Sequence, residues 1–316
     1  MRLAGVDIGT LTCRLLIADV DRDFHLHILE SDRRMLRLGQ GVDRHKRLAP
    51  EAMARVVSTL RIWKGRMDAW NVENAIAVAT SAVREAENRE EFVTQVKRET
   101  DMEVKVVDGE EEARLALLGI RAGLPVHQSR ADLLALDIGG GSTEFILSRR
   151  EKAPVVVSME MGVVRFTERF LWRDPPAPDE LKKVEQLVYH LTDEALGFIG
   201  RPADVTFIGT AGTITTLAAM AQGLETYDPA RIHCFLLSLR MIKELEAMLV
   251  SRTRTQRVGL PGLEPGREDV IVAGTLILRC VMETLGVEGC VVSEYGLREG
   301  ILVDLAQRRV GVQMKS

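Results

Sequence analysis

The fold is decided by two similar stretches, Leu3-Ala-Gly-Val-Asp-Ile-Gly-Thr10 and Leu134-Ala-Leu-Asp-Ile-Gly-Gly-Gly-Ser-Thr-Glu144. Each is an apolar run that ends in Asp-Ile-Gly, continues into hydroxyl residues and leads to a second apolar run. Short apolar runs that stop at glycine are typical of buried strands joined by tight turns. Because the pattern occurs once in each half of the chain, it predicts a duplicated domain.

A similar order of elements follows each stretch. In the first half we expect three antiparallel strands between residues 3 and 29, and then helices and strands at 50–70, 76–79, 90–99, 104–107 and 110–121. In the second half we expect strands at 133–139, 144–147, 155–157, 205–208 and 290–293, and helices at 162–172, 178–199, from 213, 238–250, 268–286 and 297–308. Residues 252–267 are expected to form an ordered loop. The sequence therefore predicts an α/β protein of two related halves.

Composition narrows the class of protein. The chain has 316 residues, 46% of them hydrophobic, which suits one large or two ordinary globular domains. Its 42 Lys and Arg residues are outnumbered by 46 Asp and Glu, giving a net charge of −4. This balance disfavours a DNA or RNA binder, and any polyanion must be met by a local basic cleft. Two basic stretches could supply one, or could be solvated faces: Arg33, Arg34, Arg37, Arg44, Lys46 and Arg47, and Arg252, Arg254, Arg257 and Arg267.

The four cysteines form no CxxC pair, which disfavours a disulfide framework or a zinc site. The N-terminus lacks the apolar run of a signal peptide, and no segment is long and apolar enough to cross a bilayer. We therefore expect a cytoplasmic protein that is not in a membrane.

The segment from Asp137 to Glu144 gives the most specific indication of a binding site. Its three glycines let main-chain N–H groups approach an anion, its hydroxyls add donors, and Asp137 can hold a hydrated Mg²⁺ ion. The alternative is a flexible hairpin turn. The segment from Asp7 to Thr12 would be the corresponding binding segment of the first half. Gly209-Thr-Ala-Gly-Thr213, between a predicted strand and helix, could bind an anion or a nucleoside, or could be a packing turn.

Glu110-Glu-Glu112 opens a predicted helix, where the helix dipole favours acids. One of them could also be a general base if it faces Glu144 across a cleft. Arg84 follows a predicted strand and would lie near the edge of that cleft; a solvated surface arginine is the alternative, as it is for Arg14 and Arg165.

Eight motifs follow one another through the whole chain: Gly5–Gly9 with Arg14–Ala18, Arg37–Gly41, Ala79–Arg84, Gly109–Ala113, Asp137–Glu144, Met161-Gly162 with Arg165, Gly209–Leu217 and Tyr295–Gly300. In this order they resemble the exopolyphosphatase/guanosine pentaphosphate phosphohydrolase (Ppx/GppA) family, within the superfamily of sugar kinases, heat-shock proteins and actin-like ATPases.

The resemblance implies two duplicated ribonuclease H-like (actin-like) domains with an active cleft between them. They would comprise residues 1–111 with 296–316, and residues 112–295. It implies hydrolysis of the terminal phosphate of inorganic polyphosphate, dependent on Mg²⁺ (or Mn²⁺) and processive, in a homodimer. The C-terminal helical domain of longer relatives is not expected. One departure is Thr10-Leu11-Thr12, where the family usually has asparagine at the middle position.

Site roles also follow from the resemblance. The catalytic residues would be Glu112 and Glu144, and the metal ligands Asp7, Asp137 and Glu144. Phosphate would be bound by Gly9, Thr10, Thr12, Arg84, Gly139, Gly140, Gly141, Ser142 and Thr143. A nucleotide or a distal phosphate would be bound by Gly209, Thr210, Ala211, Gly212, Arg257 and Arg267.

Other functions remain open. The same cleft could hydrolyse pppGpp to ppGpp, with the Gly209–Thr213 turn near the nucleoside. A kinase is a more distant alternative, because no dedicated sugar-binding signature is visible and paired glutamates favour water as acceptor. A sensor that binds polyphosphate or alarmones without turnover is a third, against which intact Glu112 and Glu144 argue.

Overall fold

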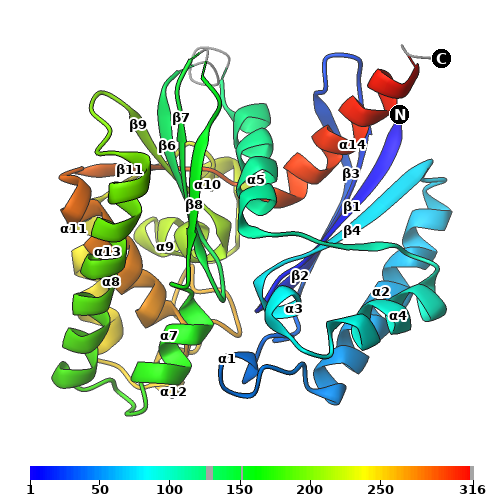
Figure 1. Cartoon of the computed structure of the whole chain (residues 1–316). Coiled ribbons are helices and arrows are strands. Elements are labelled where there is room, and N and C mark those ends of the chain that lie inside the picture. The colour runs from blue at the N-terminus through cyan, green and yellow to red at the C-terminus, as the bar shows by residue number, and fades with distance from the viewer. Residues whose placement is uncertain (126–130, 151, 314–316) are drawn as a thin grey trace. The chain divides into compact units, whose positions relative to one another are not determined.

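The computed structural model describes residues 1–125, 131–150 and 152–313, and the chain divides into two compact units (Figure 1). The first unit comprises residues 1–123 and those from Tyr295 on, and the second comprises Leu124–Glu294. The first boundary expected from the sequence lies after residue 111. The structure moves it because α5 (Gly109–Gly123) packs along α14 (Leu297–Gln313), so that both helices belong to the first unit.

The sheet of the first unit has the strand order β3-β2-β1-β4-β5. The first three strands form the expected antiparallel meander, and β4 and β5 run parallel to β1. Their bounds are β1 Arg2–Ile8, β2 Thr12–Val20, β3 Leu26–Met35, β4 Asn74–Ala79 and β5 Val104–Val106. The helices besides α5 and α14 are α1 Val42–His45, α2 Pro50–Ala69, α3 Ser81–Glu85 and α4 Arg89–Thr100. The short α1 and α3 escaped the sequence analysis, since four or five residues show no helical period.

Helices cover both faces of this sheet. On one face Trp63 of α2 and Phe92 of α4 join a core with Val6 and Leu15, whereas α14 packs on the other face. The helix α5 and the start of α14 approach each other very closely. A Cβ added at Gly119 would lie only 1.8 Å from the carbonyl oxygen of Gly296. Glycine is therefore needed where the helix that carries Glu112 meets α14.

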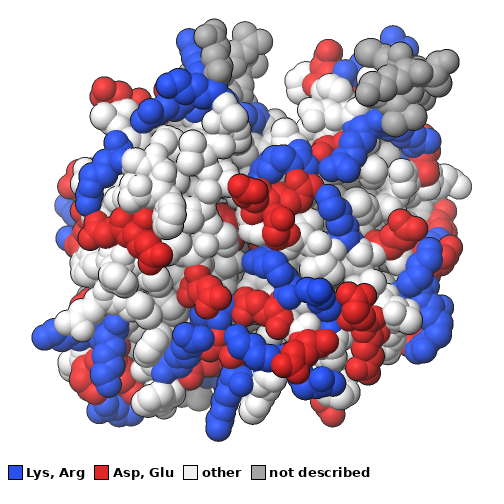
Figure 2. Space-filling view, viewed as in Figure 1, with Lys and Arg blue, Asp and Glu red and all other residues white. Residues whose placement is uncertain are grey.

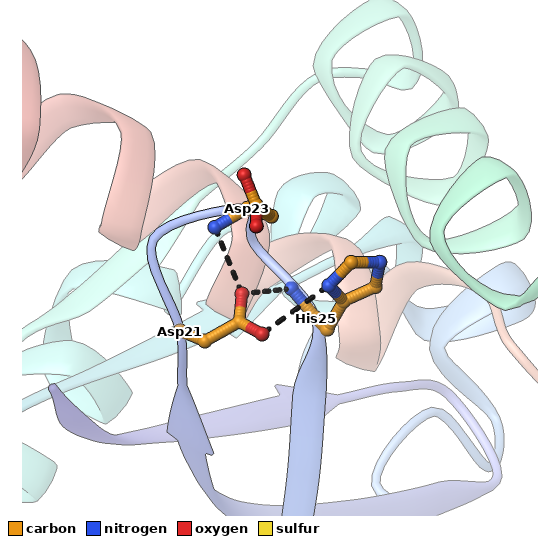
Figure 3. Close-up of side chains that lie close together, drawn as sticks. All are labelled: Asp21, Asp23 and His25. Carbon is orange, nitrogen blue, oxygen red and sulfur yellow. Dashed lines mark hydrogen bonds and ion pairs between the residues drawn. The ribbon is translucent and has the colours of Figure 1, made fainter.

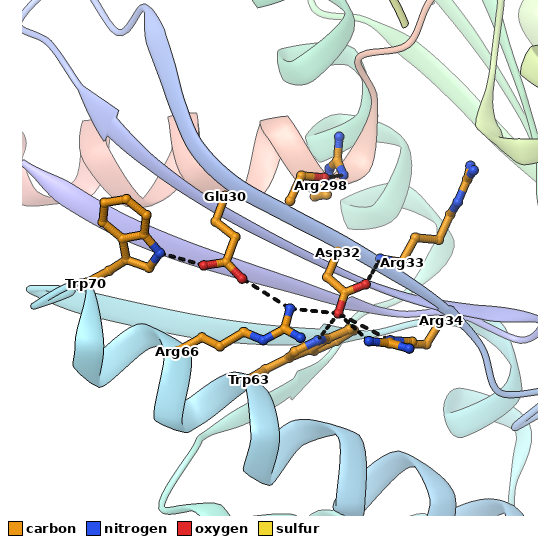
Figure 4. A network of polar contacts seen from close by, with 9 residues as sticks. Glu30, Asp32, Arg33, Arg34, Trp63, Arg66, Trp70 and Arg298 are labelled. Atoms are coloured by element: carbon orange, nitrogen blue, oxygen red, sulfur yellow. Dashed lines mark hydrogen bonds and ion pairs between the residues drawn. The ribbon is translucent and has the colours of Figure 1, made fainter. Parts of the chain in front are cut away.

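A polar network fixes β3 to α2 (Figure 4). Trp63 Nε1 donates to Asp32 Oδ2 at 3.0 Å, and Arg66 Nη1 lies 2.9 Å from the same oxygen and 3.1 Å from Glu30 Oε1. Burial opposes ionisation of Asp32, but the bonds from Trp63 and from the Arg33 amide, together with the charge of Arg34, hold its pKa below the ordinary value. Arg33 and Arg298 extend on the other side of the strand.

The sheet of the second unit has the order β10-β11-β9-β6-β7-β8, which repeats the first sheet and adds an edge strand, β10. The strands are β6 Leu133–Ile138, β7 Thr143–Ser148, β8 Val155–Met159, β9 Thr206–Thr210, β10 Leu236–Ser238 and β11 Gly289–Val292. The helices are α7 Val163–Phe170, α8 Pro178–Ile199, α9 Ala211–Ala221, α10 Pro229–Ile232, α11 Leu239–Val250, α12 Arg254–Arg257 and α13 Ile271–Leu285. The expected loop at 252–267 thus contains one short helix, α12.

The strand register confirms the duplication. Asp7 of β1 pairs with Arg14 of β2, and Asp137 of β6 pairs with Glu144 of β7. Both aspartates therefore occupy the same place on the first strand of an antiparallel meander, a strand that also lies beside a parallel one. The predicted class, two duplicated ribonuclease H-like α/β domains, is confirmed. No helix in the described ranges is both long enough and apolar enough for a membrane span.

Candidate active site

In the first unit, three motifs meet at one edge of the sheet. The strands β1, β4 and β5 are parallel, so their carboxyl ends lie together. The Thr80 amide donates to the Ile8 carbonyl at 3.3 Å, and the Val107 amide donates to the Ala79 carbonyl at 3.0 Å. The turn after Asp7, the helix that carries Arg84 and the start of α5 therefore leave the sheet side by side.

The turn at residues 9–12 is tight and closely packed. The Gly9 amide donates to the Thr12 carbonyl at 3.0 Å, and the Gly39 amide donates to the Thr10 carbonyl at 2.8 Å. A Cβ at Gly39 would lie 2.3 Å from Thr10 Cγ2, so this glycine of the Arg37–Gly41 motif makes room for the turn. Leu11 is only 5% exposed. At this position the chain has an apolar contact in place of the family's usual asparagine.

Asp7 is a buried carboxylate among opposite charges. Burial raises its pKa to about 6, while the charges of Arg14 and Arg298 pull it down and Glu299 raises it further. Arg298 donates to Ser31 Oγ at 2.8 Å and to Glu299 Oε1 at 2.9 Å, so α14 fixes its guanidinium beside β3. The Tyr295–Gly300 motif carries no role that its sequence alone predicts. Its arginine and glutamate lie close enough to Asp7 to affect its charge.

The structure separates the three acids of Glu110-Glu-Glu112. Glu110 is exposed, and hydrogen bonds from Arg114 and Lys105 lower the pKa of Glu111 to about 2. Glu112 is 9% exposed, and Arg84 Nη1 lies 3.1 Å from its Oε2 while donating to the Val107 carbonyl at 2.8 Å. Arg84 thus fixes one buried glutamate, the one that the family resemblance marks as catalytic.

In the second unit, a row of oxygen-bearing side chains crosses four strands. The register places Ser158, Glu144, Asp137 and Thr210 at neighbouring positions on β8, β7, β6 and β9. Glu144 is 1% exposed and accepts a hydrogen bond from Ser158 Oγ at 2.7 Å. Directly opposed residues of an antiparallel pair have Cβ atoms about 5 Å apart, and like charges there repel.

Carboxylates at this spacing suit a hard divalent cation, because Mg²⁺ prefers oxygen ligands and is usually held by one or two carboxylates. Asp137 and Glu144 supply two, which fits the predicted metal chemistry.

Another acidic group lies elsewhere. Within the described part of the chain, one group of three residues, Asp21, Asp23 and His25, brings its ligand atoms within 4.8 Å of one another (Figure 3). Asp21 Oδ1 there accepts the amides of Asp23 and His25, both at 2.9 Å. These bonds are those of a β2–β3 turn, and none of the three residues is a predicted metal ligand.

The glycine-rich segment forms the β6–β7 turn. The Gly139 amide donates to the Ser142 carbonyl at 2.9 Å, as Gly9 does to Thr12 in the first unit. Ser142 is 5% exposed, and Thr143 is fully buried with its hydroxyl bonded to the Met161 carbonyl. The Thr143 hydroxyl proton is therefore used within the fold, which leaves the backbone of Gly139–Ser142 as the main candidate for phosphate.

The second glycine motif has a mixed role. A Cβ at Gly209 would lie 2.6 Å from Cys290 Sγ, so this glycine serves packing, and Thr210 Oγ1 donates to the Ser293 carbonyl at 3.1 Å. Ala211 has a φ of 70°, a strained value for a residue with a Cβ. A Cβ at Gly212 would lie 2.0 Å from Arg267 Nη2, so the fold brings these two predicted residues together at the start of α9.

The two late arginines differ in what they contact. Arg267 is 3% exposed, and its Nε lies 2.5 Å from Glu264 Oε2. Arg257 is 2% exposed and donates to the carbonyls of Leu249, Glu268 and Arg252 at 2.7–3.0 Å. Its guanidinium therefore ties the end of α11 to the following loop, a structural task that the sequence analysis did not expect.

The basic stretch at 33–47 is partly neutralised. Lys46 lies 3.7 Å from Glu85, Arg47 lies 3.9 Å from Glu87, and Arg34 lies 3.2 Å from Asp32. Figure 2 likewise shows positive and negative side chains interspersed over the face in view. These contacts favour the reading of a solvated, charge-balanced surface for this stretch.

Comparisons with known proteins agree with these features. The model of the Ppx/GppA phosphatase family matches residues 16–309. The chain is 36% identical to exopolyphosphatase 2 of Mycobacterium tuberculosis, over 96% of this chain and 98% of that protein. It is similar to the crystal structure of an exopolyphosphatase from Cytophaga hutchinsonii (TM-score 0.87, 31% identity, 96% and 97% covered) and to that of a Ppx/GppA family member from Aquifex aeolicus (TM-score 0.82, 34% identity, 98% of both covered). The chain therefore belongs to the Ppx/GppA phosphatase family, as its motifs predicted.

Proposed function

We propose that the chain is an exopolyphosphatase, which hydrolyses the terminal phosphoanhydride bond of inorganic polyphosphate. Family membership and the similarity to exopolyphosphatases along the whole chain support this activity. The water oxygen forms a bond to the terminal phosphorus, and the bond from that phosphorus to the bridging oxygen breaks. Orthophosphate leaves, and the polymer is one phosphate shorter. We further propose that release is processive.

The observation that carries the proposal is Glu112, a buried carboxylate at the start of α5 that Arg84 holds by a 3.1 Å contact. A general base must keep a fixed position next to the attacking water. Glu112 has such an anchor, whereas Glu110 is exposed and Glu111 is paired with Arg114 and Lys105. We assign Glu112 to orient the attacking water and accept its proton.

The other groups stabilise charge, which is most of what phosphoryl transfer requires. Asp137 and Glu144 would hold Mg²⁺ or Mn²⁺, which neutralises phosphate oxygens when bound; a metal role for Asp7 stays a prediction. The Gly139–Ser142 backbone holds the terminal phosphate in this proposal, and Arg84 adds positive charge near Glu112. Glu144 also assists in orienting the water.

The test measures phosphate release in the presence of Mg²⁺ from long-chain polyphosphate, from pppGpp and from ATP with a sugar. We expect polyphosphate to have the highest kcat/KM. Release from pppGpp alone would overturn the proposed substrate, and sugar phosphorylation would identify a kinase. Binding of polyphosphate without release would identify a sensor.

The pairing of Gly212 with Arg267 at the start of α9 favours pppGpp hydrolysis as a second candidate. A guanidinium beside a helix N-terminus is suited to a phosphate or a nucleoside. Arg267→Lys should then lower kcat/KM for pppGpp more than for polyphosphate. An equal change for both substrates would contradict a nucleotide-specific role. The homodimer and the cytoplasmic location stay predictions.

A further inference from the structure

The start of α7 lies directly against the glycine turn of the second unit. The Val163 amide donates to the Gly139 carbonyl at 3.1 Å, and the Val164 amide donates to the Gly140 carbonyl at 2.9 Å. A Cβ at Gly162 would lie 2.3 Å from the Gly140 oxygen, so the preceding residue must be glycine for the helix to approach. The first turn of α7 thus serves as a support for the turn that we assign to phosphate.

Arg165 completes this support from its side chain. Its Nε donates to the Gly141 carbonyl at 2.9 Å, and its amide lies 3.3 Å from the Gly140 carbonyl. The side chain is 3% exposed, so the interpretation of a solvated surface arginine is wrong. Its ion-pair partner Glu160, at 3.6 Å, is 73% exposed, so this contact does not account for burying the guanidinium.

These hydrogen bonds also fix the direction in which the amides of the glycine turn point. A trans peptide is planar, and its C=O and the N–H of the next residue point in opposite directions. The carbonyls of Gly139, Gly140 and Gly141 are all held by α7 and Arg165. The amides of Gly140, Gly141 and Ser142 must therefore all point away from α7. Successive N–H groups with a common direction form an anion-binding concavity.

We propose that Arg165 is a positioning residue for phosphate binding. By holding the Gly141 carbonyl it orients the Gly141–Ser142 peptide so that the Ser142 amide joins its two neighbours in facing the terminal phosphate. Arg165 does not touch the substrate. The proposal rests on the proposed function of this turn as the phosphate site, and it extends that function to a residue of α7.

The first test replaces Arg165 by lysine, which keeps the charge and the approximate volume but loses the fixed guanidinium geometry. Arg169→Lys, one turn later on an exposed position of α7, is the matched control. We expect Arg165→Lys to keep a melting temperature near that of the wild type. Its dissociation constant for inorganic phosphate, by calorimetric titration with Mg²⁺, should rise about tenfold, and KM for polyphosphate should rise with it, because about one oriented donor is lost.

A second variant perturbs the same turn without changing a charged residue. Val163→Pro removes the amide that donates to Gly139, and proline suits the first position of a helix whose preceding residue is extended. We expect weaker phosphate binding with helix α7 preserved. A phosphate dissociation constant within twofold of the wild type in both variants, or an equal change in Arg169→Lys, would overturn the proposal.

The titration also separates this proposal from the proposed function. If the wild-type protein binds phosphate but releases none from polyphosphate, the function fails, and the effect of Arg165→Lys on binding still decides the positioning role. If the wild type is active and Arg165→Lys equals it in KM and in phosphate binding, only the positioning role fails.

Discussion

The two units share a strand order and a central aspartate but differ in what surrounds it. In the first unit the row across β1, β2 and β3 reads Asp7, Arg14, Arg33, and in the second unit the row across β6, β7 and β8 reads Asp137, Glu144, Ser158. The two units share the turn and the aspartate, but the neighbouring position is a cation in the first unit and an acid in the second. In the first unit the charge of Arg14 pulls the pKa of Asp7 down against the larger effect of burial, whereas in the second unit Glu144 places a second acid beside Asp137.

This difference gives the two units separate roles in the proposed reaction. In the first unit Glu112 lies on α5, where Arg84 holds it by a 3.1 Å contact. In the second unit the acids lie on the sheet, and the turn between their strands offers backbone amides. We therefore expect mutations in the first unit to impair activation of the attacking water. Mutations in the second unit should impair the binding of metal and of phosphate.

The largest effect is expected for Glu112→Gln. The amide cannot accept a proton, so kcat for phosphate release should fall roughly 10³-fold, within the usual range for loss of a general base. The melting temperature and phosphate binding should change little, because the amide can keep its contact with Arg84. Retained turnover in a stopped assay would remove Glu112 from its assigned role.

Glu144→Gln tests the second unit in the same way. One carboxylate of the cross-strand pair is lost, so kcat should fall about 10²-fold and half-saturation by Mg²⁺ should require a higher concentration. Arg14→Gln is the control at the equivalent position of the first unit, and it should leave the Mg²⁺ half-saturation less affected. If both variants shift the metal dependence equally, the contrast between the two rows is wrong.

Asp7→Asn should reveal the energetic cost of the buried carboxylate. Its pKa is raised to about 6 in the folded protein, so the folded state binds more protons than the unfolded state between pH 4 and 6. The free energy of unfolding therefore falls as the pH rises through this range and stays lower above it. Without metal, Asp7→Asn should be more stable than the wild type by about 3 kcal/mol at pH 7 and no more stable at pH 3.5. Urea unfolding at both pH values measures this, and an equal gain at the two values would contradict it.

The smallest effect on activity is expected for Leu11→Asn, which restores the family's usual residue. Leu11 is buried, so the change should cost about 2 kcal/mol of stability, the transfer free energy of one such side chain. Activity should change less than about threefold, since the backbone of the turn already has its partners. An activity gain above tenfold would instead show that the missing amide is a substrate contact.

Much of the fold could be predicted from the sequence, because apolar runs and paired Asp-Ile-Gly turns report strands and their order. The helices α3 and α12 and the edge strand β10 could not, since elements of three to five residues have no measurable period. The site was predicted less completely. Nothing in the run of three glutamates says which one is buried, because Lys105 of β5 and Arg84 of α3 reach it from other elements, in addition to Arg114 of the same helix.

The arginines show the same limit. Arg257 and Arg267 belong to one basic stretch, yet the first bonds to backbone carbonyls and the second lies against Gly212. For Arg165 the sequence left a solvated surface position open as an alternative, and only the contact with the Gly141 carbonyl excludes it. These distinctions depend on which long-range partner each guanidinium meets, and single-sequence patterns do not contain that information.

The central claim is that water attacks the terminal phosphorus of polyphosphate. The most direct measurement incubates the wild-type protein with Mg²⁺ and long-chain polyphosphate in water enriched in ¹⁸O, and follows the released orthophosphate by mass spectrometry. We expect orthophosphate to accumulate with one solvent oxygen in each molecule released, and the Glu112→Gln variant to release almost none. Absence of release by the wild type, or orthophosphate without solvent oxygen, would contradict the account.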